Sequence, residues 1–181
     1  VDEIVAQWDD GDEVAHHREY RTATGTIDDV PVSTTSTGIG SPSAAIAVEE
    51  LARVGAETFI RVGSCGSVRG CVPVGDLVIT TGAIRGEGTS DDYVREDYPA
   101  AASYAVVAAL IRAAEELDFR YHLGVTLSTD SFYPGQTRPG FGGYEAPGTD
   151  ALLADLRATN VTNIEMEASA ILTAASLYGL R

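Results

Sequence analysis

Residues 41–66, SPSAAIAVEELARVGAETFIRVGSCG, decide the fold class of this chain. A Ser-Pro pair opens a segment, 43–54, whose apolar side chains recur at helical spacing until Gly55, a common residue at a helix end. The apolar run 58–62 then predicts a strand that leads into a Gly-Ser-Cys-Gly turn at 63–66. A helix followed closely by a strand is the repeating unit of α/β proteins.

The rest of the chain alternates in the same way. Residues 18–27 and 30–37 predict a β-hairpin that turns at Asp28 and Asp29. Further strands are expected at 76–81, 121–128 and 163–166, and further helices at 100–117, 149–157 and 167–178. This order predicts an α/β sandwich with a mixed or largely parallel sheet, and the length of 181 residues suits a single domain. Polar and glycine clusters follow the strands, where ligands bind in such folds.

The composition is strongly acidic. Twelve basic residues, all of them Arg, stand against 27 Asp and Glu, for a formal net charge of -15. This balance disfavours nucleic acid as a partner, because phosphate binding needs a basic surface. Acidic residues crowd the first stretch, which we interpret as a solvated edge. An acidic surface without Lys is typical of proteins kept hydrated in high salt, so we hypothesise a salt-adapted, halophilic protein.

Neither a membrane segment nor a secretory signal is evident, since no apolar run approaches the roughly 20 residues of a spanning helix. We therefore expect a cytoplasmic protein. Cys65 and Cys71 match no zinc-ligand spacing and predict two reduced structural thiols. His16 and His17 are interpreted as a solvated strand entry, because adjacent strand residues point to opposite faces. No GxSxG elbow supports a catalytic triad.

Arg61 and the turn that follows it could enclose an anion. A guanidinium forms charge-assisted hydrogen bonds, and glycine lets backbone N–H groups approach the anion's oxygens. The stretch is not a P-loop, because GxxxxGK[ST] is absent. An ion pair of Arg61 at an ordinary strand end explains the same residues, so both interpretations stay open.

The loop FYPGQTR, residues 132–138, could bind a pyrimidine base. The carboxamide of Gln136 both donates and accepts, so it matches the adjacent carbonyl and N–H of such a ring. Arg138 would face the other carbonyl, and Phe132 would supply an apolar wall. A Pro-Gly turn with solvated polar side chains is the alternative.

The triplet Glu165-Met166-Glu167 lies where a predicted strand meets a helix. A carboxylate there could accept hydrogen bonds from two ribose hydroxyls while Met166 packs against the sugar. The ordinary preference of acidic residues for the first turn of a helix explains the same triplet without any function.

Five stretches make the sequence similar to a known family. They are STGIGSPSAAIAVEEL (36–51), FIRVGSCG (59–66), VPVGDLVITT (72–81), GVTLSTDSFYPGQTR (124–138) and NIEMEASAILT (163–173). Together they resemble the hexameric purine/uridine nucleoside phosphorylase family, in order, from about His17 to the last residue. FYPGQTR is the most specific, because its Gln-x-Arg pair separates the family members that act on uridine from those that act on purine nucleosides.

The resemblance implies a three-layer α/β/α sandwich and a pentosyltransferase that converts uridine and phosphate to uracil and ribose 1-phosphate. It implies phosphate ligands at Arg18, Arg61 and Ser64, ribose ligands at Ser64, Met166 and Glu167, and base ligands at Phe132, Gln136 and Arg138. Of these, Arg138, Gln136 and Glu167 would be catalytic. No cofactor would be required, and phosphate would be the co-substrate.

The resemblance also implies an assembly. Arg18 would reach the phosphate of a neighbouring subunit, so that active sites are shared within dimers of a homo-hexamer, a trimer of dimers. A structural potassium ion would lie at the dimer interface, at Glu19, Ile39 and Ser43. Uridine, phosphate and further copies of the chain are thus the expected partners, with no nucleic acid or membrane.

The chain departs from the family in four places. Family members begin with a strand and a Gly-Asp-Pro loop that carries another phosphate-binding Arg, and they continue past the final helix with a strand and a terminal helix. Both segments are expected to be missing from residues 1–181. Ser64 replaces the more usual Thr and keeps the hydroxyl, and the loop after Arg138 is shorter.

Three readings compete with uridine phosphorolysis. A purine nucleoside phosphorylase or a nucleosidase on the same fold would be expected to lack the Gln136-x-Arg138 pair. A non-catalytic nucleoside-binding protein would not need Arg18, Arg61 or Ser64.

Overall fold

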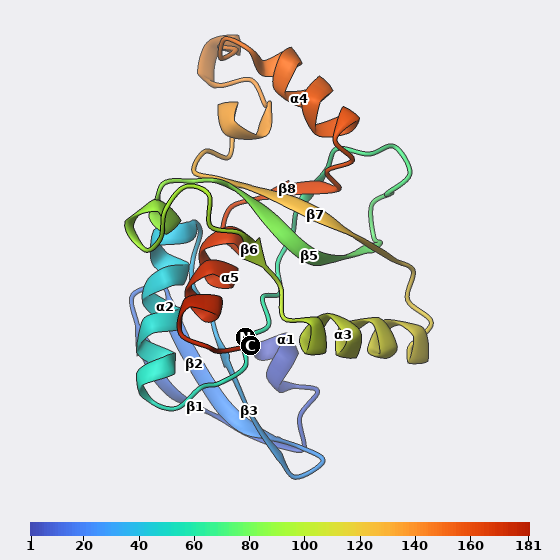
Figure 1. Ribbon diagram of the computed structural model, residues 1–181. Helices are drawn as coiled ribbons and strands as arrows, with labels where there is room; N and C mark the ends of the chain where they lie inside the picture. Colours follow the sequence, from blue (N-terminus) through green and yellow to red (C-terminus); the bar gives the residue numbers. More distant parts are fainter. The chain divides into compact units, whose positions relative to one another are not determined.

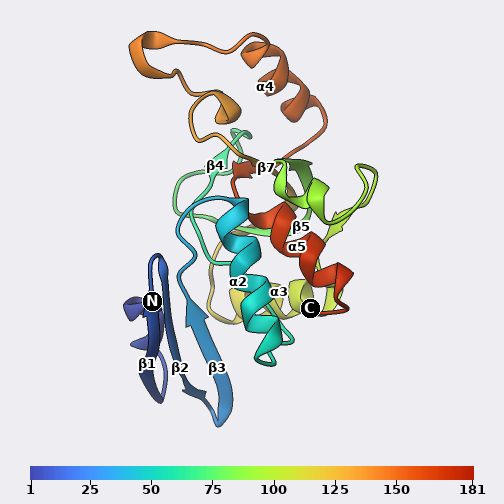
Figure 2. The ribbon, with the colours of Figure 1, turned by 90° about the vertical axis from the view of Figure 1, so that its left-hand side faces the viewer.

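The computed structural model describes residues 1–181 and divides them into two compact units, Val1–Ile39 and Gly40–Arg181. Figures 1 and 2 show the first unit in blue and the second in cyan to red.

The first unit is a three-stranded antiparallel sheet preceded by a short helix. Helix α1 spans Asp2–Val5, and the strands are β1 (Asp10–His17), β2 (Tyr20–Ile27) and β3 (Val30–Thr35), with β2 in the centre. The predicted hairpin at Asp28 and Asp29 is confirmed. Both aspartates have positive φ, 50° and 64°, which matches the two-residue turn that suits the twist of a hairpin.

The interpretation of the acidic first stretch as a solvated edge is confirmed, since β1 is an exposed edge strand of this sheet. Its side chains are mostly exposed, as expected, but they make specific cross-strand bonds. Asp10 Oδ1 accepts hydrogen bonds from the backbone N–H of Thr26 at 2.8 Å and from its hydroxyl at 2.7 Å. Arg21 on β2 binds both Glu13 and Asp2. These pairs fix the register of a strand whose sequence has no apolar face.

The second unit contains a five-stranded mixed sheet in the order β4-β8-β7-β5-β6. Its strands are β4 (Gly66–Ser67), β5 (Leu77–Gly86), β6 (Ala100–Ala101), β7 (Tyr121–Thr129) and β8 (Asn163–Glu165). The three central strands are parallel, and the two edge strands are antiparallel to their neighbours. The α/β class and the mixed sheet expected from the sequence are confirmed.

Four helices accompany this sheet: α2 (Ser41–Arg53), α3 (Tyr104–Glu116), α4 (Thr149–Ala158) and α5 (Ala168–Leu177). Short 3₁₀ turns occupy Thr89–Asp92, Pro134–Gln136 and Phe141–Gly143. Helix α5 packs against α2 and against β5, β6 and β7, and Figures 1 and 2 both show α2 and α5 side by side. Their facing surfaces are built mainly of buried alanines, which lets the two backbones approach closely.

A separate apolar cluster lies beneath α4. Its buried members are Val68, Leu127, Leu156, Val161 and Ile164, with Leu152 and Leu153 packed against them. The cluster joins α4 to strands β7 and β8, and so supports the carboxyl ends of both strands from one side.

The predicted strand at 58–62 is wrong, because these residues belong to no sheet. This segment makes backbone hydrogen bonds with Arg181 instead. Phe59 N–H donates to the carbonyl oxygen of Arg181 at 2.6 Å, and Arg181 N–H donates to the carbonyl oxygen of Glu57 at 2.9 Å. Ile60 and Val62 are 56% and 78% exposed. An apolar run becomes a strand only where a neighbouring strand pairs with it, and here no strand of the sheet lies alongside.

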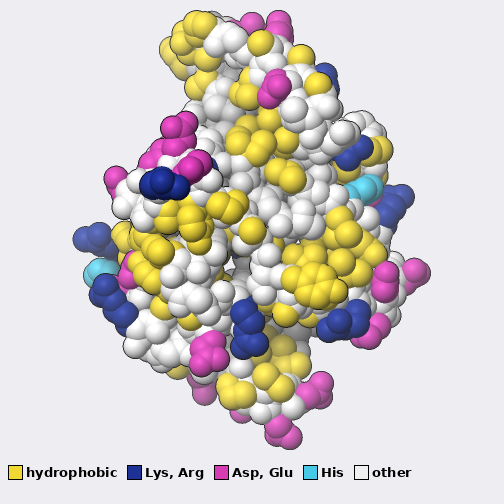
Figure 3. Space-filling view, in the orientation of Figure 1, with side chains coloured by type: hydrophobic (Ala, Val, Ile, Leu, Met, Phe, Trp, Pro, Cys, Tyr) yellow, Lys and Arg dark blue, Asp and Glu magenta, His cyan; other side chains and the backbone are white.

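The surface carries its acidic charge in many places. Figure 3 shows Asp and Glu side chains at several separated points of one face, among fewer Arg side chains and several patches of hydrophobic ones. None of the helices combines the length and the hydrophobicity that crossing a bilayer demands. Cys65 and Cys71 are both free, as predicted, and both are exposed.

Asp76 ties together the first residues of the parallel strands β5 and β7. Its side chain is almost fully buried and lies 2.6 Å from Nε of Arg120 and 2.7 Å from Nε2 of His122. Burial by itself would raise the pKa of Asp76, but the hydrogen bonds from His122 and Arg120 outweigh it and hold the pKa below its ordinary value. The ionised carboxylate is therefore stabilised by folding.

Asp76→Asn is expected to weaken the acid dependence of stability. A carboxyl group whose pKa is lower in the folded state contributes stability above its unfolded pKa of about 3.9, and this contribution is lost as the pH falls through the folded pKa. Urea unfolding of both proteins between neutral pH and about pH 3 measures the difference. Asp97→Asn, at an exposed surface pair, is the control. Equal acid dependence of wild type and Asp76→Asn would contradict the role given to Asp76.

Candidate active site

Arg61 is the centre of the candidate site, where it contacts two carboxylates. Its Nε lies 3.1 Å from Oε2 of Glu165, and its Nη2 donates to Oε2 of Glu167. Both glutamates are buried, whereas Arg61 is partly exposed. The ion-pair interpretation of Arg61, which the sequence left open, is confirmed. It does not exclude anion binding, because Nη1 of Arg61 has no protein acceptor.

Glu165 is the last residue of β8, and the start of α5 folds back over its carboxylate. Oε2 accepts hydrogen bonds from the backbone N–H groups of Glu167 at 2.8 Å and Ala168 at 2.9 Å. These groups belong to the first turn of α5, where unpaired N–H groups and the helix dipole favour a negative charge. Oε1 accepts from the hydroxyl of Ser128 at the end of β7, at 2.5 Å.

Glu167 links α5 to the beginning of α2. Its Oε1 accepts from the backbone N–H of Gly40 at 2.6 Å. Gly40 has φ 100°, a conformation that favours glycine. Beside it, the Ser41 hydroxyl donates to the carbonyl oxygen of Met166 at 2.7 Å. The predicted helix start at Ser41 therefore also holds the triplet 165–167 in place.

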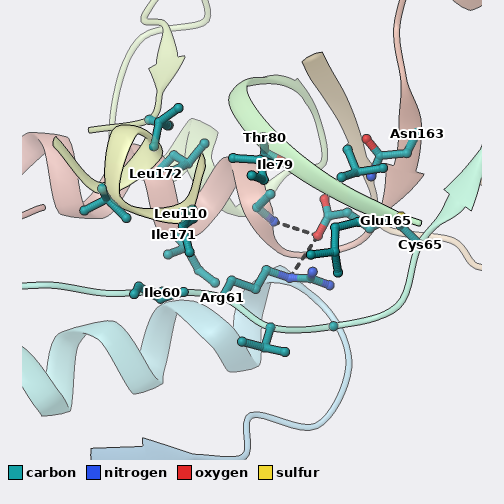
Figure 4. A pocket seen from close by; sticks show the side chains of 18 of the residues that line it. Ile60, Arg61, Cys65, Ile79, Thr80, Leu110, Asn163, Glu165, Ile171 and Leu172 are labelled. Carbon is teal, nitrogen blue, oxygen red and sulfur yellow. Dashed lines mark hydrogen bonds and ion pairs between the residues drawn. The ribbon is translucent and has the colours of Figure 1, made fainter. Parts of the chain in front are cut away.

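A cavity of about 790 Å³ opens beside Arg61. Arg61, Ser64, Cys65, Asn163 and Glu165 line its polar end, and Figure 4 shows all of these except Ser64 by label, together with apolar side chains of α3 and α5. Of the residues predicted to bind phosphate, the structure thus brings Arg61 and Ser64 to one cavity. The turn predicted at 63–66 is not formed, because residues 63–65 adopt no regular structure or turn and Gly66 begins β4.

The loop predicted to bind the base folds on itself. Arg138 Cζ lies 4.0 Å from the centre of the Phe132 ring, a cation–π contact. Gln136 is buried, with 8% of its surface exposed, and Phe132 is half-exposed. A Cβ atom added to Gly66 would lie 3.4 Å from Nη2 of Arg138, so this guanidinium lies beside the start of β4.

The remaining predicted site residues are divided between the two units. Arg18 is at the tip of the β1–β2 hairpin with φ 54°, and Glu19 and Ile39 also belong to the first unit. Ser43 lies in the first turn of α2, in the second unit. Phe132, Gln136, Arg138, Met166 and Glu167 belong to the second unit but do not line the cavity. No cluster of three or more His, Cys, Asp or Glu side chains is arranged to hold a metal ion.

A buried hydrogen-bond network behind Glu165 was not predicted from the sequence. The backbone N–H of Ser169 donates to the Ser128 hydroxyl at 2.9 Å, and the Ser169 hydroxyl donates to Oε1 of Glu87 at 2.8 Å. Glu87 directly follows β5 and is buried. Ser128 lies at the end of the predicted strand 121–128 and Ser169 near the start of the predicted helix 167–178, which was the available signal, whereas Glu87 lies beyond the predicted strand 76–81 because β5 is longer than expected. Their pairing depends on the order of β5, β7 and β8 in the sheet, which local patterns do not reveal.

This arrangement favours chemistry on a ligand with both anionic and hydroxyl groups. Arg61 offers N–H donors to an anion, and Glu167 offers acceptor positions to hydroxyls. Around Arg61 one formal positive charge faces two negative ones, from Glu165 and Glu167, a local balance of -1. A dianion at this position needs further cations to offset the carboxylates.

The fold and this site define the class of protein. The whole chain, residues 1–181, matches the model of the phosphorylase superfamily, and the chain belongs to that superfamily. The resemblance seen in the sequence is thereby confirmed.

Particular relatives are similar over the full length of the chain. A uridine phosphorylase of Thermococcus kodakarensis is 56% identical over 181 residues, which are 100% of this chain and 65% of that protein. A uridine phosphorylase of Klebsiella aerogenes is 41% identical, over 100% of this chain and 72% of that protein. A guanosine phosphorylase of Halorubrum lacusprofundi is also 41% identical, over 100% of this chain and 70% of that protein. The chain therefore spans about two thirds of the length of these relatives.

Proposed function

We propose that the protein is a uridine phosphorylase, which reversibly converts uridine and phosphate to uracil and ribose 1-phosphate. One observation carries the proposal. Arg61, bound by Glu165 and Glu167, lies in the same unit as Arg138, whose guanidinium lies beside Gly66. The groups proposed for the anion, for a sugar hydroxyl and for the base are thus all near the segment 61–66, which supports a shared site. The 56% identity to a uridine phosphorylase supports the choice of base.

In the proposed reaction, a phosphate oxygen forms a bond to the ribose carbon while the bond from that carbon to the uracil nitrogen breaks. Phosphate is held by Arg61, Ser64 and Arg18, and ribose by Ser64, Met166 and Glu167. Positive charge develops on the sugar and negative charge on uracil, which Gln136 and Arg138 stabilise beside Phe132. Catalysis is then positioning and electrostatic stabilisation, with no covalent enzyme intermediate and no cofactor.

The excess of carboxylates around Arg61 supports the proposal that Arg18 contributes to the phosphate site. A second guanidinium would bring the local formal charge from -1 to zero before phosphate arrives. Arg18 occupies the exposed tip of a hairpin, a suitable position from which to reach another subunit. We accordingly propose dimers with shared active sites, assembled into a homo-hexamer as a trimer of dimers. Within it, the two layers of helices would enclose the sheet as a three-layer sandwich.

Three further properties belong to the same proposal. Glu19, Ile39 and Ser43 would supply only oxygen ligands, the type that hard cations such as potassium prefer. The free state of Cys65 and Cys71 supports a reducing, cytoplasmic location. The net charge of -15 without Lys supports adaptation to high salt.

Guanosine is the second candidate substrate, because a guanosine phosphorylase is 41% identical over the whole chain. The buried Gln136 and the adjacent Arg138 favour uracil instead. A carboxamide and a guanidinium together complement the alternating carbonyls and N–H of a pyrimidine ring. A nucleosidase and a non-catalytic nucleoside-binding protein remain as weaker alternatives, because neither makes use of Arg61 and Ser64 for phosphate.

Release of free base from uridine, guanosine and inosine tests the proposal, each with and without phosphate, at low and high salt. We expect phosphate-dependent release of uracil with the purine nucleosides nearly inert. Faster release of guanine or hypoxanthine would overturn the assignment of the base. Release without phosphate would indicate a nucleosidase, and no release from any nucleoside would leave a binding protein. Full activity without salt would contradict salt adaptation.

A further inference from the structure

The two carboxylates that contact Arg61 differ in how firmly the protein holds them. Glu165 accepts hydrogen bonds from the Ser128 hydroxyl and from two backbone N–H groups of the α5 start, in addition to its contact with Arg61 Nε. Three of these four groups contact Oε2, so that oxygen is fully engaged, whereas Oε1 accepts only from the Ser128 hydroxyl. Only 4% of Glu165 is exposed, so burial rather than a lack of acceptor positions keeps a substrate away from Oε1.

Glu167 is held less completely. It accepts one hydrogen bond from Gly40 N–H and one from Arg61 Nη2. About two of its acceptor positions therefore remain for ribose hydroxyls. A ligand that draws on Glu167 weakens its contact with Arg61 but leaves the contact of Glu165 intact. Of the two glutamates, Glu165 is the one that can keep Arg61 in place while the reaction proceeds.

The contact with Glu165 determines the direction of the whole guanidinium. The group is planar and its N–H bonds have fixed angles, so binding Nε sets where both terminal nitrogens point. A Cβ atom on Gly63 would lie 2.9 Å from Nη1, 3.0 Å from Cζ and 3.0 Å from Nη2 of Arg61, so the backbone at Gly63 lies against a face of the guanidinium. The guanidinium of Arg61 thus contacts Glu165 through Nε and Glu167 through Nη2, with Gly63 against one face. Its remaining nitrogen, Nη1, is available to donate to an anion.

We propose that Glu165 is a positioning residue, which fixes Arg61 through Nε so that its terminal N–H groups are oriented toward phosphate before phosphate binds. The proposal rests on the proposed function, in which Arg61 holds phosphate. Glu165 touches no substrate, and it acts through Arg61. Ser128 and the first turn of α5 are the groups that keep Glu165 itself in place.

Glu165→Gln tests this role, because it keeps the shape of the side chain but removes the negative charge that pairs with Arg61. Losing this ion pair, and with it the orientation of the guanidinium, should raise the phosphate KM about ten- to hundredfold, with the uridine KM changing less than about threefold. Glu50→Gln on the exposed face of α2 is the matched control and should change neither. A rise in the uridine KM equal to the rise in the phosphate KM would overturn the proposal.

A double variant separates positioning from a merely structural role. In an Arg61→Ala background there is no guanidinium to orient, so adding Glu165→Gln should lower kcat/KM for phosphate by less than about twofold. A structural role would instead give the same large factor in both backgrounds, and that result would overturn the proposal. Thermal unfolding of each variant shows whether it is folded.

A measurement of phosphate binding in the absence of nucleoside tests the role of Glu165 independently of the reaction. Phosphate should raise the Tm of the wild type, and Glu165→Gln should remove most of that rise; an undiminished rise would overturn the proposal. If no nucleoside is cleaved but this difference is still seen, the proposed function fails and the positioning role holds. Should Glu165→Gln not fold, Ser128→Ala removes one holder of Glu165 and should reduce the same phosphate-induced rise. An unchanged rise in Ser128→Ala would then count against the role.

Discussion

Arg138→Ala is expected to lower kcat/KM for uridine about a hundred- to a thousandfold while leaving the protein folded. Removing one preorganised partner of a developing negative charge typically costs about 2.7–4 kcal/mol of barrier. Arg138 lies over the Phe132 ring and makes no side-chain ion pair, so its removal breaks no buried network. The measurement is steady-state phosphorolysis of uridine, with thermal unfolding to show that the fold persists.

The control for this variant is Arg95→Ala, which removes a guanidinium that is 88% exposed and pairs only with Asp97. Its kinetics should match the wild type. A normal uridine rate in Arg138→Ala would mean that another group stabilises the leaving base, and the uracil assignment would fail with it. If Arg138→Ala loses its folded state as well as its activity, Arg138→Gln replaces it in the test, because glutamine keeps a long side chain and an N–H donor.

Gly124→Ala is expected to destabilise the second unit by about 1–3 kcal/mol, the usual cost of overpacking a core. A Cβ atom at Gly124 on β7 would lie 1.8 Å from Oγ1 of Thr162 and 3.0 Å from its Cβ. Thr162 is 1% exposed, so its side chain has little room to move away. Urea unfolding measures the change in the free energy of unfolding.

The contact with Thr162 can be verified by relief of the clash. Oγ1 of Thr162 has no hydrogen-bond partner, so removing it sacrifices no hydrogen bond. Gly124→Ala combined with Thr162→Ala should therefore be more stable than Gly124→Ala alone, whereas Thr162→Val retains the bulk and should give no relief. If the Thr162→Ala combination were no more stable than the single variant, the clash would lie elsewhere.

Elements with a clear local pattern were predicted well from the sequence. Strand β7 begins at Tyr121 and β8 at Asn163, as expected, and α2 begins at its Ser-Pro pair. Failures occurred where neighbours decide the outcome. Residues 58–62 have the composition of a strand but no strand beside them in the sheet, and β1 has an acidic sequence that pairs through specific side-chain bonds.

The candidate site followed the same rule. The sequence identified Arg61, Ser64 and the triplet 165–167 from their positions after strands, and the structure brings Arg61 to both glutamates. The sequence could not show that protein donors hold Glu165 more completely than Glu167. The hydrogen bonds of these glutamates come from Ser128 and Gly40, which are distant in the sequence. The ligand roles of all the predicted site residues, those expected to bind phosphate, ribose, the base or potassium, stay predictions.

The distance along the chain between Arg61 and its partners has a consequence for how the protein is made. Arg61 and Glu167 are 106 residues apart, so at about 5–20 residues per second a ribosome takes about 5–20 seconds to go from one to the other. Throughout that interval helix α2 and the arginine have already been synthesised, while β8, which lies between β4 and β7, has not. Until β8 and the start of α5 are made, β4 lacks the strand it pairs with and Arg61 lacks both glutamates, so the site can form only late.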